Sequence, residues 1–575
     1  MSSSAYIGIP GFLVLLGLWL STKLVLNAWR ELKTIQLRGP PPTSRILGLS
    51  GDILQSPDIS LAYEDWAAQY GPVFEVPLAF GRKKIVLTDP KALIHFYNSE
   101  RSVYTKAKND RIFIGRIVNS LRSLYERANV LASSGVAFYG RKEIRTNGPP
   151  QLQCVTNSWL IGICSSRQRK ALIPAFSNAA IRRLTAVFYD SVYKLKSFWD
   201  TILESSSDGA IIEVEEWMNR IALDSVGIAG FSHDFRYLEG QQSPVTTAFE
   251  AMGNTKMSLL TRLVFLLSFT FPFVLSVPTE RIRLFWELRR SLNVIARRLL
   301  ANMRREKESG VAEELTDKSV IGLLLKAELA DSELRLTQEE VVAQVRLHFR
   351  SVENVLLLAG YETTSIALTW ALIELAKHPE IQDKLRRDLA RFSGNDPTWD
   401  QLVSELPYLD ATVHEVLRLH PPVSEIIREA GHDDVIPLGT PVVTPSGETI
   451  SSVIIAKGTP VFVPIRTINR SEALWGPEAK KFKPERWFED VSFSAKELPG
   501  HRHLLTFHDG PRTCLGKLFA LAEFKAVLFV LIRNYVFEFP NGPETKIVNH
   551  VAVIPRPKVA GQNGAKVPLR VRRVE

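Results

Sequence analysis

The ten residues 507–516, FHDGPRTCLG, constrain this chain more than any other segment, because they place a single cysteine in a loop that leads into a helical pattern. The whole chain has three cysteines, too few for a disulfide framework, so a functional cysteine would act alone. A thiolate is stabilised by a nearby cation, a metal ion or helix N-terminal amides, and Arg512 lies two residues before Cys514. Gly510 and Gly516 allow the backbone to approach a flat group closely. We therefore predict that Cys514 is an axial metal ligand; the alternative is an inert, small apolar side chain.

The rest of the chain has the pattern of one large, mainly helical domain. Its 575 residues, 45% of them hydrophobic, are enough for a large buried core. No Pro-, Gly- or Ser-rich linker divides residues 43–555, so we expect a single domain there. Short extended stretches at 73–78 and 84–87 indicate a minor β portion. Longer helical patterns cover residues 181–203, 280–307, 338–377, 380–392 and 411–419.

The N-terminal residues predict a membrane anchor. Residues 1–22 carry no charged side chain, and 7–20 are almost wholly apolar, which approaches the length that a helix needs to cross a bilayer. Positive charges follow at Lys23 and Arg30, so the positive-inside rule places the rest of the chain in the cytosol. A cleaved signal peptide would have a basic region before the apolar run, and none is evident; a buried core helix is the third interpretation. Residues 23–42 end in three consecutive prolines and predict a stiff, basic hinge.

Two segments lack a regular pattern. Residues 141–164 show neither helical nor strand periodicity directly before a basic helix start, which indicates an insertion or a disordered loop. Residues 556–575 are rich in Lys, Arg and Val and predict a loose basic tail.

At the cysteine loop the chain resembles the cytochrome P450 family. The run 507–516 matches the family's haem-binding signature F-x-x-G-x-R-x-C-x-G at every defined position, which includes Phe507, Gly510 and Gly516. The resemblance implies that Cys514 is the thiolate ligand of the haem iron, a ligand that favours cleavage of the O–O bond. It also implies that Arg512 binds a haem propionate.

Further motifs of the family lie upstream in the expected order. Glu415 and Arg418 form the E-x-x-R pair on one face of a helix, and Arg486 in the segment PERW resembles the arginine that completes a structural triad. Residues 359–364, AGYETT, resemble the motif of a long helix beside the iron. There Glu362 and Thr363 would relay protons to dioxygen, next to a local distortion of the helix that holds water.

Two further arginines are expected near the propionates by the same resemblance. Arg428 follows the turn HPP at 420–422, and Arg169 opens a helix in the segment RKALIPAFS. The family normally has an aromatic residue four positions before this second arginine, whereas this chain has Ser165. Because the mismatch lies at the end of the patternless stretch, we interpret 141–164 as an insertion, as if translated from an unspliced intron, that displaces the helix start.

The resemblance implies a mainly α fold with a minor β portion: one large catalytic domain of the cytochrome P450 fold behind an N-terminal transmembrane helix. It implies a monooxygenase with heme b that oxidises a hydrophobic small molecule with O2. NADPH-cytochrome P450 reductase would supply the electrons, because the chain has no dinucleotide-binding fingerprint. The expected location is the endoplasmic reticulum membrane, crossed once, with the catalytic domain cytosolic and no nucleic-acid partner. The net charge of +10 suits a membrane surface or an acidic partner, for which Lys517 is a candidate docking residue.

The substrate is the least constrained part of this interpretation. The apolar segments 104–118, 265–273 and 423–427 are expected to line the substrate pocket. They favour a terpenoid, a steroid or a polycyclic aromatic, as in fungal secondary metabolism or xenobiotic oxidation. Two alternatives stay open. One is a reductase-independent isomerase or dehydratase of the same fold, against which Thr363 argues, and the other is an inactive or mis-spliced haem-binding product.

Overall fold

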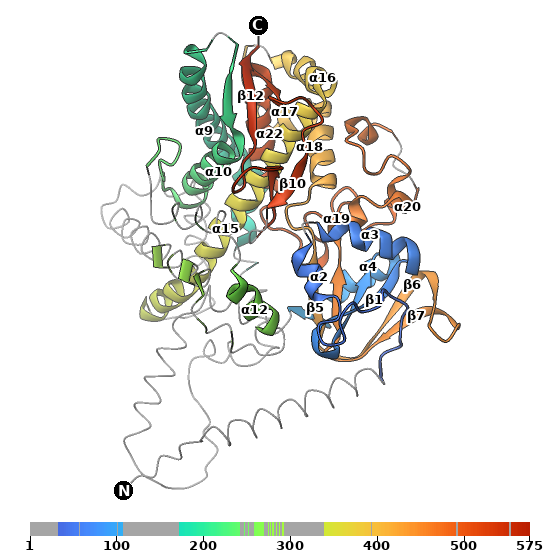
Figure 1. The fold of residues 1–575 in the computed structure, drawn as a ribbon. Helices are drawn as coiled ribbons and strands as arrows, with labels where there is room; N and C mark the ends of the chain where they lie inside the picture. The colour runs from blue at the N-terminus through green and yellow to red at the C-terminus, as the bar shows by residue number, and fades with distance from the viewer. Residues whose placement is uncertain are drawn as a thin grey trace.

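The computed structural model describes residues 33–106, 172–241, 258–268 and 338–574 with short gaps, and single residues between 169 and 291. The described part is rich in helices and contains four small sheets, so the prediction of a mainly helical chain with a minor β portion is confirmed (Figure 1). The predicted anchor, 1–22, and the predicted insertion, 141–164, lie outside the described residues. Among the helices that the structure describes, none has the length and apolarity needed to cross a membrane.

A bundle of long helices forms the larger core. The central helix α22 is apolar on all sides and is almost entirely buried from Phe519 to Ile532, because the other helices surround it. Phe188 of α9 packs against Phe519 of α22, and Trp199 of α9 packs against Trp217 of α10; Phe188 and Trp199 are fully buried. The main helices of this bundle are α9 (Asn178–Glu204), α10 (Val214–Phe231), α15 (Gln338–Lys377), α16 (Pro379–Leu389), α18 (Pro407–Leu419) and α22 (Lys517–Asn534).

The helical predictions agree with this bundle except at the ends of the elements. The helix predicted at 338–377 is α15, and the helix predicted at 181–203 is α9, which begins earlier because Ser177 caps it. The helix predicted at 411–419 begins four residues earlier in α18, where Pro407 occupies the first turn. Most of the helix predicted at 280–307 lies outside the described residues.

A mixed sheet of five strands forms the second lobe, at the lower right of Figure 1. All of its pairings are antiparallel except the one between β2 and β8. Side chains of β2 alternate, so that Ile85 and Leu87 join one apolar cluster and Val86 joins the cluster on the opposite face. The strands lie in the order β1 (Val73–Pro77), β2 (Lys83–Leu87), β8 (Pro460–Val463), β5 (Ile426–Ala430) and β3 (Tyr104–Lys106).

Shorter elements complete this lobe and its junction with the bundle. A hairpin of β6 (Asp434–Val443) and β7 (Thr449–Ile455) extends from it, and α4 packs against β6. The remaining helices are α2 (Ser50–Gln55), α3 (Ile59–Tyr70), α4 (Pro90–Ser99), α12 (Leu259–Ser268), α17 (Trp399–Ser404), α19 (Ile465–Asn469), α20 (Glu472–Trp475) and α21 (Phe493–Lys496).

The C-terminal segment is part of the core, so the prediction of a loose basic tail at 556–575 is wrong. Strand β12 (Pro568–Arg573) lies between β4 (Ala210–Glu213) and β9 (Tyr535–Glu538), and β11 (Arg556–Val559) pairs with β10 (Ile547–His550). The apolar and basic residues of β12 alternate, which is a strand pattern. Leu569 and Val571 are fully buried, while Arg570 and Arg572, which alternate with them, form ion pairs with Asp208 and Glu538.

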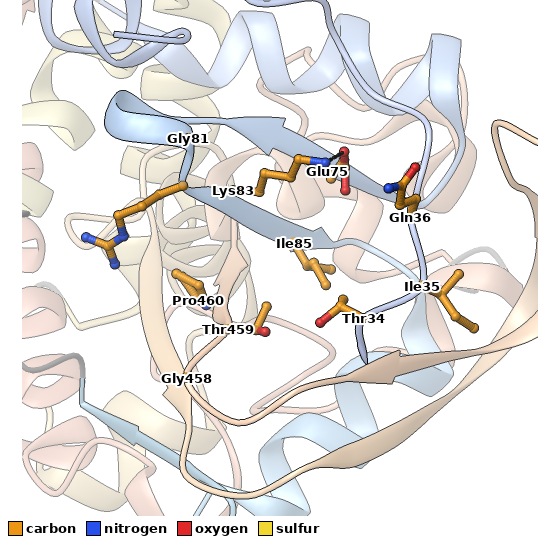
Figure 2. Close-up of a pocket in the computed structure, with 11 residues that line it drawn as sticks. Thr34, Ile35, Gln36, Glu75, Gly81, Lys83, Ile85, Gly458, Thr459 and Pro460 are labelled. Atoms are coloured by element: carbon orange, nitrogen blue, oxygen red, sulfur yellow. Dashed lines mark ion pairs between the residues drawn. The ribbon is translucent and has the colours of Figure 1, made fainter. Parts of the chain in front are cut away.

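The described part of the predicted hinge lies against the sheet. The carbonyl oxygen of Arg38 accepts a hydrogen bond of 3.1 Å from Glu75 N, and Leu37 is 2% exposed. Thr34, Ile35 and Gln36 line a pocket together with β1, β2 and the turn before β8 (Figure 2). This pocket contains none of the predicted site residues. Residues 34–38 are therefore docked on the sheet lobe and do not stand away from it as a spacer.

Candidate active site

The cysteine loop is a tight turn that leads into α22. Its ends are joined by a hydrogen bond of 2.8 Å from Cys514 N to the carbonyl oxygen of Phe507. Gly510 has a φ of +63°, and a Cβ atom there would lie 2.6 Å from the carbonyl oxygen of Tyr97. A glycine is therefore required at this position for two reasons, the positive φ and the close approach of α4.

The Cys514 side chain is accessible, yet it lies in a dense part of the protein. Burial raises the pKa of the Cys514 thiol, while a hydrogen bond from the backbone of Gly516 and the charges of Arg169 and Lys517 oppose that rise. The protein alone thus leaves the thiol protonated at neutral pH. A metal ion would supply the positive charge that a thiolate needs here.

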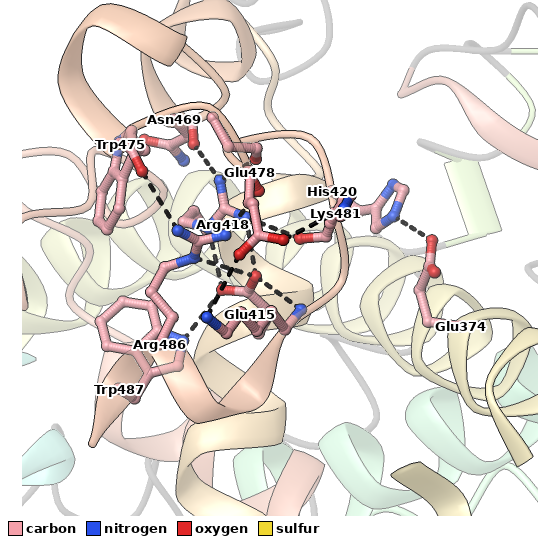
Figure 3. A network of polar contacts seen from close by, with 12 residues as sticks. Glu374, Glu415, Arg418, His420, Asn469, Trp475, Glu478, Lys481, Arg486 and Trp487 are labelled. Atoms are coloured by element: carbon pink, nitrogen blue, oxygen red, sulfur yellow. Dashed lines mark hydrogen bonds and ion pairs between the residues drawn. The ribbon is translucent and has the colours of Figure 1, made fainter. Parts of the chain in front are cut away.

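Glu415, Arg418 and Arg486 meet in one buried network, which we call the Glu415 network (Figure 3). Arg418 donates to both carboxylate oxygens of Glu415, with Nε–Oε2 at 2.9 Å and Nη2–Oε1 at 2.8 Å. Arg486 Nε lies 3.4 Å from Glu415 Oε1, and the indole nitrogen of Trp487 donates to Oε2 at 3.1 Å. The remaining donors of the two arginines bind backbone carbonyl oxygens, those of Asn469, Trp475, Glu478, Ala479 and Lys481.

The Glu415 network is connected to the cysteine loop through two polar side chains. Arg418 binds the carbonyl oxygen of Asn469, and the Asn469 amide donates to Thr506 Oγ1 at 3.0 Å. Thr506 in turn donates to the carbonyl oxygen of Leu417 at 2.8 Å, directly before the loop begins at Phe507. The network thus ties α18 to the start of the loop. Asn469 and Thr506 were missed by the sequence analysis, because no local pattern marks them.

A second charged cluster lies on the other side of the loop, between α4 and β5. Glu100 is fully buried at the end of α4, and its Oε1 accepts a hydrogen bond of 2.5 Å from Arg428 Nε. Arg512 Nε lies 3.6 Å from the same oxygen. We call these three residues the Glu100 cluster. Arg169 is also directed at the loop, where its Nη2 donates to the carbonyl oxygen of Thr513 at 2.6 Å.

The proposed proton-relay residues lie in the middle of α15. Thr363 Oγ1 donates to the carbonyl oxygen of Ala359 at 2.5 Å, one turn earlier. Glu362 is buried, and its Oε1 accepts from Arg556 Nη2 at 3.2 Å; Arg556 Nη1 donates to Glu215 at 3.0 Å. Arg556 is a site residue that the sequence analysis missed, because the segment around it was interpreted as a loose tail.

Helix α15 is one continuous helix from Gln338 to Lys377. Gly360 lies where this helix approaches α10. A Cβ atom on Gly360 would lie 2.7 Å from Val226 Cγ2, so the glycine allows α10 and α15 to pack closely.

A helical bundle with one accessible cysteine, held on a rigid loop beside clustered arginines, defines a protein that binds a metal cofactor through a single axial thiolate. Comparisons with known proteins agree with that class. A family model described as cytochrome P450 matches residues 165–560. The chain is 52% identical to cytochrome P450 monooxygenase claQ of Ampulloclitocybe clavipes, over 97% of each chain. It is 51% identical to cytochrome P450 monooxygenase claO of the same fungus, over 100% of each, and 32% identical to cytochrome P450 monooxygenase 205 of Postia placenta, over 93% and 92%.

The chain therefore belongs to the cytochrome P450 family and is a monooxygenase of the haem-thiolate type. Members of this family use O2 and a redox partner and act on small molecules. The match of the family model starts at residue 165, directly after the segment 141–164.

The side chains at the site fit a haem. Apart from the ion pair with Glu100, no hydrogen bond joins the guanidinium of Arg512 to another described residue, so its terminal nitrogens are available to a carboxylate. Gly516 has a φ of −83°, and the nearest protein atom to a Cβ there would be Phe176 Cε1 at 3.8 Å. Packing among the described residues thus does not explain the glycine at 516, whereas close approach to a flat cofactor does.

Proposed function

We propose that this chain is a membrane-anchored monooxygenase that inserts one oxygen atom of O2 into a hydrophobic small molecule, with electrons from an NADPH-dependent cytochrome P450 reductase. The observation that carries the proposal is the geometry of Cys514: an accessible thiol, on a loop braced by the Glu415 network, with arginines beside it. When bound, the haem with its thiolate ligand supplies the activation of dioxygen.

The residues of the chain have separate tasks in this proposal. Cys514 binds the iron, and the hydrogen bond from Cys514 N to Phe507 holds the loop in shape around it. Arg512 and Arg428 bind the haem propionates, and Arg169 supports the loop from its other end.

Glu362 and Thr363 would hold and move the protons that oxygen insertion consumes. The carboxylate of Glu362 is held by Arg556, and the hydroxyl of Thr363 is oriented by its bond to Ala359. A threonine in this position favours oxygen insertion over the isomerase and dehydratase chemistry of the same fold.

The location and the substrate class extend this proposal. Residues 1–22 anchor the chain in the endoplasmic reticulum membrane, and the catalytic domain faces the cytosol. A terpenoid, a steroid or a polycyclic aromatic enters from the membrane side. The reductase docks near Lys517, the first residue of α22, which follows Cys514 by three positions.

The deciding experiment is the carbon-monoxide difference spectrum of the dithionite-reduced protein in membranes, for the wild type and for Cys514→Ala. We expect the red-shifted Soret band of a thiolate-bound haem in the wild type and its loss in the variant. A band that survives in Cys514→Ala would show that another residue binds the iron. Product formation from a panel of terpenoids, steroids and polycyclic aromatics, with and without the reductase, then tests substrate and partner.

A deletion tests the proposed insertion. We expect the chain lacking residues 141–164 to show the same red-shifted band, because this segment has neither helical nor strand periodicity. A band in the shortened chain alone would mean that the 575-residue chain is a mis-spliced product. A band in the full chain alone would contradict the insertion hypothesis.

A further inference from the structure

Glu100 is a buried carboxylate that no motif of the chain marks, and it contacts two of the arginines assigned to the cofactor. It ends α4 and is 0% exposed, and its backbone N–H donates to the carbonyl oxygen of Tyr97. A single oxygen, Oε1, faces both Arg428 Nε at 2.5 Å and Arg512 Nε at 3.6 Å. The two arginines come from different parts of the chain, β5 and the cysteine loop, so Glu100 is the group that brings their guanidiniums to one place.

The way in which Glu100 holds the arginines leaves their outer edges free for a second anion. Both guanidiniums are contacted at Nε, the nitrogen nearest the aliphatic stem. Arg428 uses Nη1 for the carbonyl oxygen of Ile427 at 3.0 Å, and no hydrogen bond to a described residue occupies its Nη2 or the terminal nitrogens of Arg512. A guanidinium that is fixed at Nε presents its terminal nitrogens in a defined direction, as bidentate binding of a carboxylate requires.

The polar atoms around the Glu100 cluster are incompletely paired among the described residues. Three buried atoms lack a hydrogen-bond partner: Glu100 Oε2, Tyr97 Oη and His508 Nδ1. The charge of Arg428 acts on both Tyr97 and His508, so these two side chains lie near the Glu100 cluster. Native proteins pair nearly all buried polar atoms, so a concentration of unpaired ones marks a place where another polar group belongs.

The net charge of the Glu100 cluster also favours an additional anionic group. Two guanidiniums share one carboxylate, and beside them Lys106 adds a positive charge near His508 while Asp509 adds a negative charge near Tyr97. Burial, together with repulsion from Arg428, lowers the pKa of Arg512, while Glu100 opposes this effect. Without Glu100 the two arginines would repel each other, and with it the cluster still has an excess of positive charge.

We propose that Glu100 is the positioning residue that holds Arg428 and Arg512 in place for the propionates of the haem, and so slows haem loss from the protein. The proposal rests on the assignment of these arginines to the propionates under the proposed function. Glu100 touches no cofactor atom in this proposal. It acts through the two guanidiniums, which it orients and partly neutralises so that they remain close together.

The test compares haem loss from the membrane-bound holoenzyme for the wild type, Glu100→Gln and Asp89→Asn. Asp89 is the matched control, because it is a buried carboxylate that caps the other end of α4 and binds the backbone of Gly439 and Thr440. Haem loss is measured as transfer to an excess of a haem-free globin. We expect Glu100→Gln to lose haem about 10- to 100-fold faster than the wild type, as for other residues that orient cofactor ligands. Asp89→Asn should lose haem at the wild-type rate even if its unfolding temperature falls.

A second measurement separates positioning from a general weakening of the fold. Wild type and Glu100→Gln are loaded with the dimethyl ester of haem, whose propionates carry no charge. The two proteins should then lose the ester at similar rates, because the arginines have no carboxylate to bind.

Two results would overturn the proposal: wild-type haem retention in Glu100→Gln, or an equally large difference between the two proteins with the ester. Either result leaves the red-shifted band of the wild type intact. Absence of that band in the wild type would instead mean that the proposed function has failed.

Discussion

Two buried clusters of this molecule contain the same three side chains, one glutamate and two arginines, and differ in how completely their polar atoms are paired. In the Glu415 network both carboxylate oxygens accept from several donors, and the arginines are further satisfied by backbone carbonyl groups. In the Glu100 cluster one carboxylate oxygen contacts both arginines and the other has no partner among the described residues. The same residue types therefore form a fully paired structural network around Glu415 and an incompletely paired cluster around Glu100 that can bind a further group.

The difference originates in the surrounding backbone. The turn that follows α20 directs the carbonyl groups of Glu478, Ala479 and Lys481 at the arginines of the Glu415 network (Figure 3). Among the described residues, the Glu100 cluster receives one such carbonyl group, from Ile427. A buried charge that is fully hydrogen-bonded stabilises a single conformation, whereas one that is partly paired favours an additional ligand.

The largest expected effect is that of breaking the Glu415 network. Arg418→Ala leaves Glu415 buried with a reduced set of donors and removes the link to Asn469, so we expect a loss of about 3–5 kcal/mol in the free energy of unfolding, with loss of bound haem. Urea unfolding and haem content check this. Lys481→Ala is the matched control, because its side chain is 72% exposed while its backbone carbonyl still binds Arg418, and it should leave both quantities unchanged. A similar stability for both variants would contradict the scaffold role.

A third buried network joins Glu362, Arg556 and Glu215. Its charged groups are paired as in the Glu415 network, yet it contains a proposed proton donor, so it tests whether such pairing excludes a functional role. We expect Glu362→Gln to slow product formation about 100-fold or more, since the amide accepts from Arg556 but donates no acidic proton. Steady-state turnover with the reductase measures this, and the carbon-monoxide spectrum should stay unchanged.

Glu374→Gln is the control for that variant. Glu374 is also buried on α15, and it binds His420 at 2.7 Å. We expect its replacement to affect stability more than turnover. If turnover falls equally in both variants, Glu362 has no specific part in proton transfer.

We expect acid to lower the free energy of unfolding, because His420 becomes protonated more readily in the unfolded chain. Burial lowers the pKa of His420 from its ordinary 6.5 to about 4, although the hydrogen bond with Glu374 opposes this effect. The unfolded chain therefore binds a proton at a higher pH than the folded chain. This contribution to stability is present above pH 6.5 and is lost as the pH falls toward 4, by about 3 kcal/mol.

Urea unfolding as a function of pH tests this effect. We expect His420→Gln to have a shallower decline of stability over the same pH range than the wild type. The decline should not vanish, because burial also lowers the pKa of His414 to about 4. An unchanged slope in His420→Gln would mean that His420 titrates normally in the folded protein.

The smallest expected effects come from the two glycines of the cysteine loop. Gly510→Ala meets the carbonyl oxygen of Tyr97 at a φ of +63° and should cost about 1–3 kcal/mol of stability. Gly516→Ala has no protein atom nearer than 3.8 Å and should change the unfolding free energy by less than about 0.5 kcal/mol, while weakening haem retention. If Gly516→Ala and the wild type retain haem equally, then close approach of the haem does not explain the glycine at this position.

Much of the fold followed from local patterns. The uniform helical periodicity of 338–377 predicts α15, and the apolar, β-branched stretches at 73–78 and 84–87 predict β1 and β2, because each pattern extends over a whole element. The C-terminal strands were missed, since β12 alternates Leu and Val with arginines and depends on β4 and β9 to bury its apolar side. The docking of residues 34–38 depends likewise on a sheet edge that is distant in sequence.

The sequence by itself determined which family the chain belongs to and which residues form the cysteine loop, because a close approach of backbone to a flat cofactor restricts the defined positions of a short motif. It also paired Glu415 with Arg418, since three residues separate neighbours on a helix. Only the tertiary structure brought Glu100 to Arg428 and Arg512, and Arg556 to Glu362, across 328, 412 and 194 positions of the chain. These contacts arise from the packing of whole elements, and no local pattern records which charges that packing brings together.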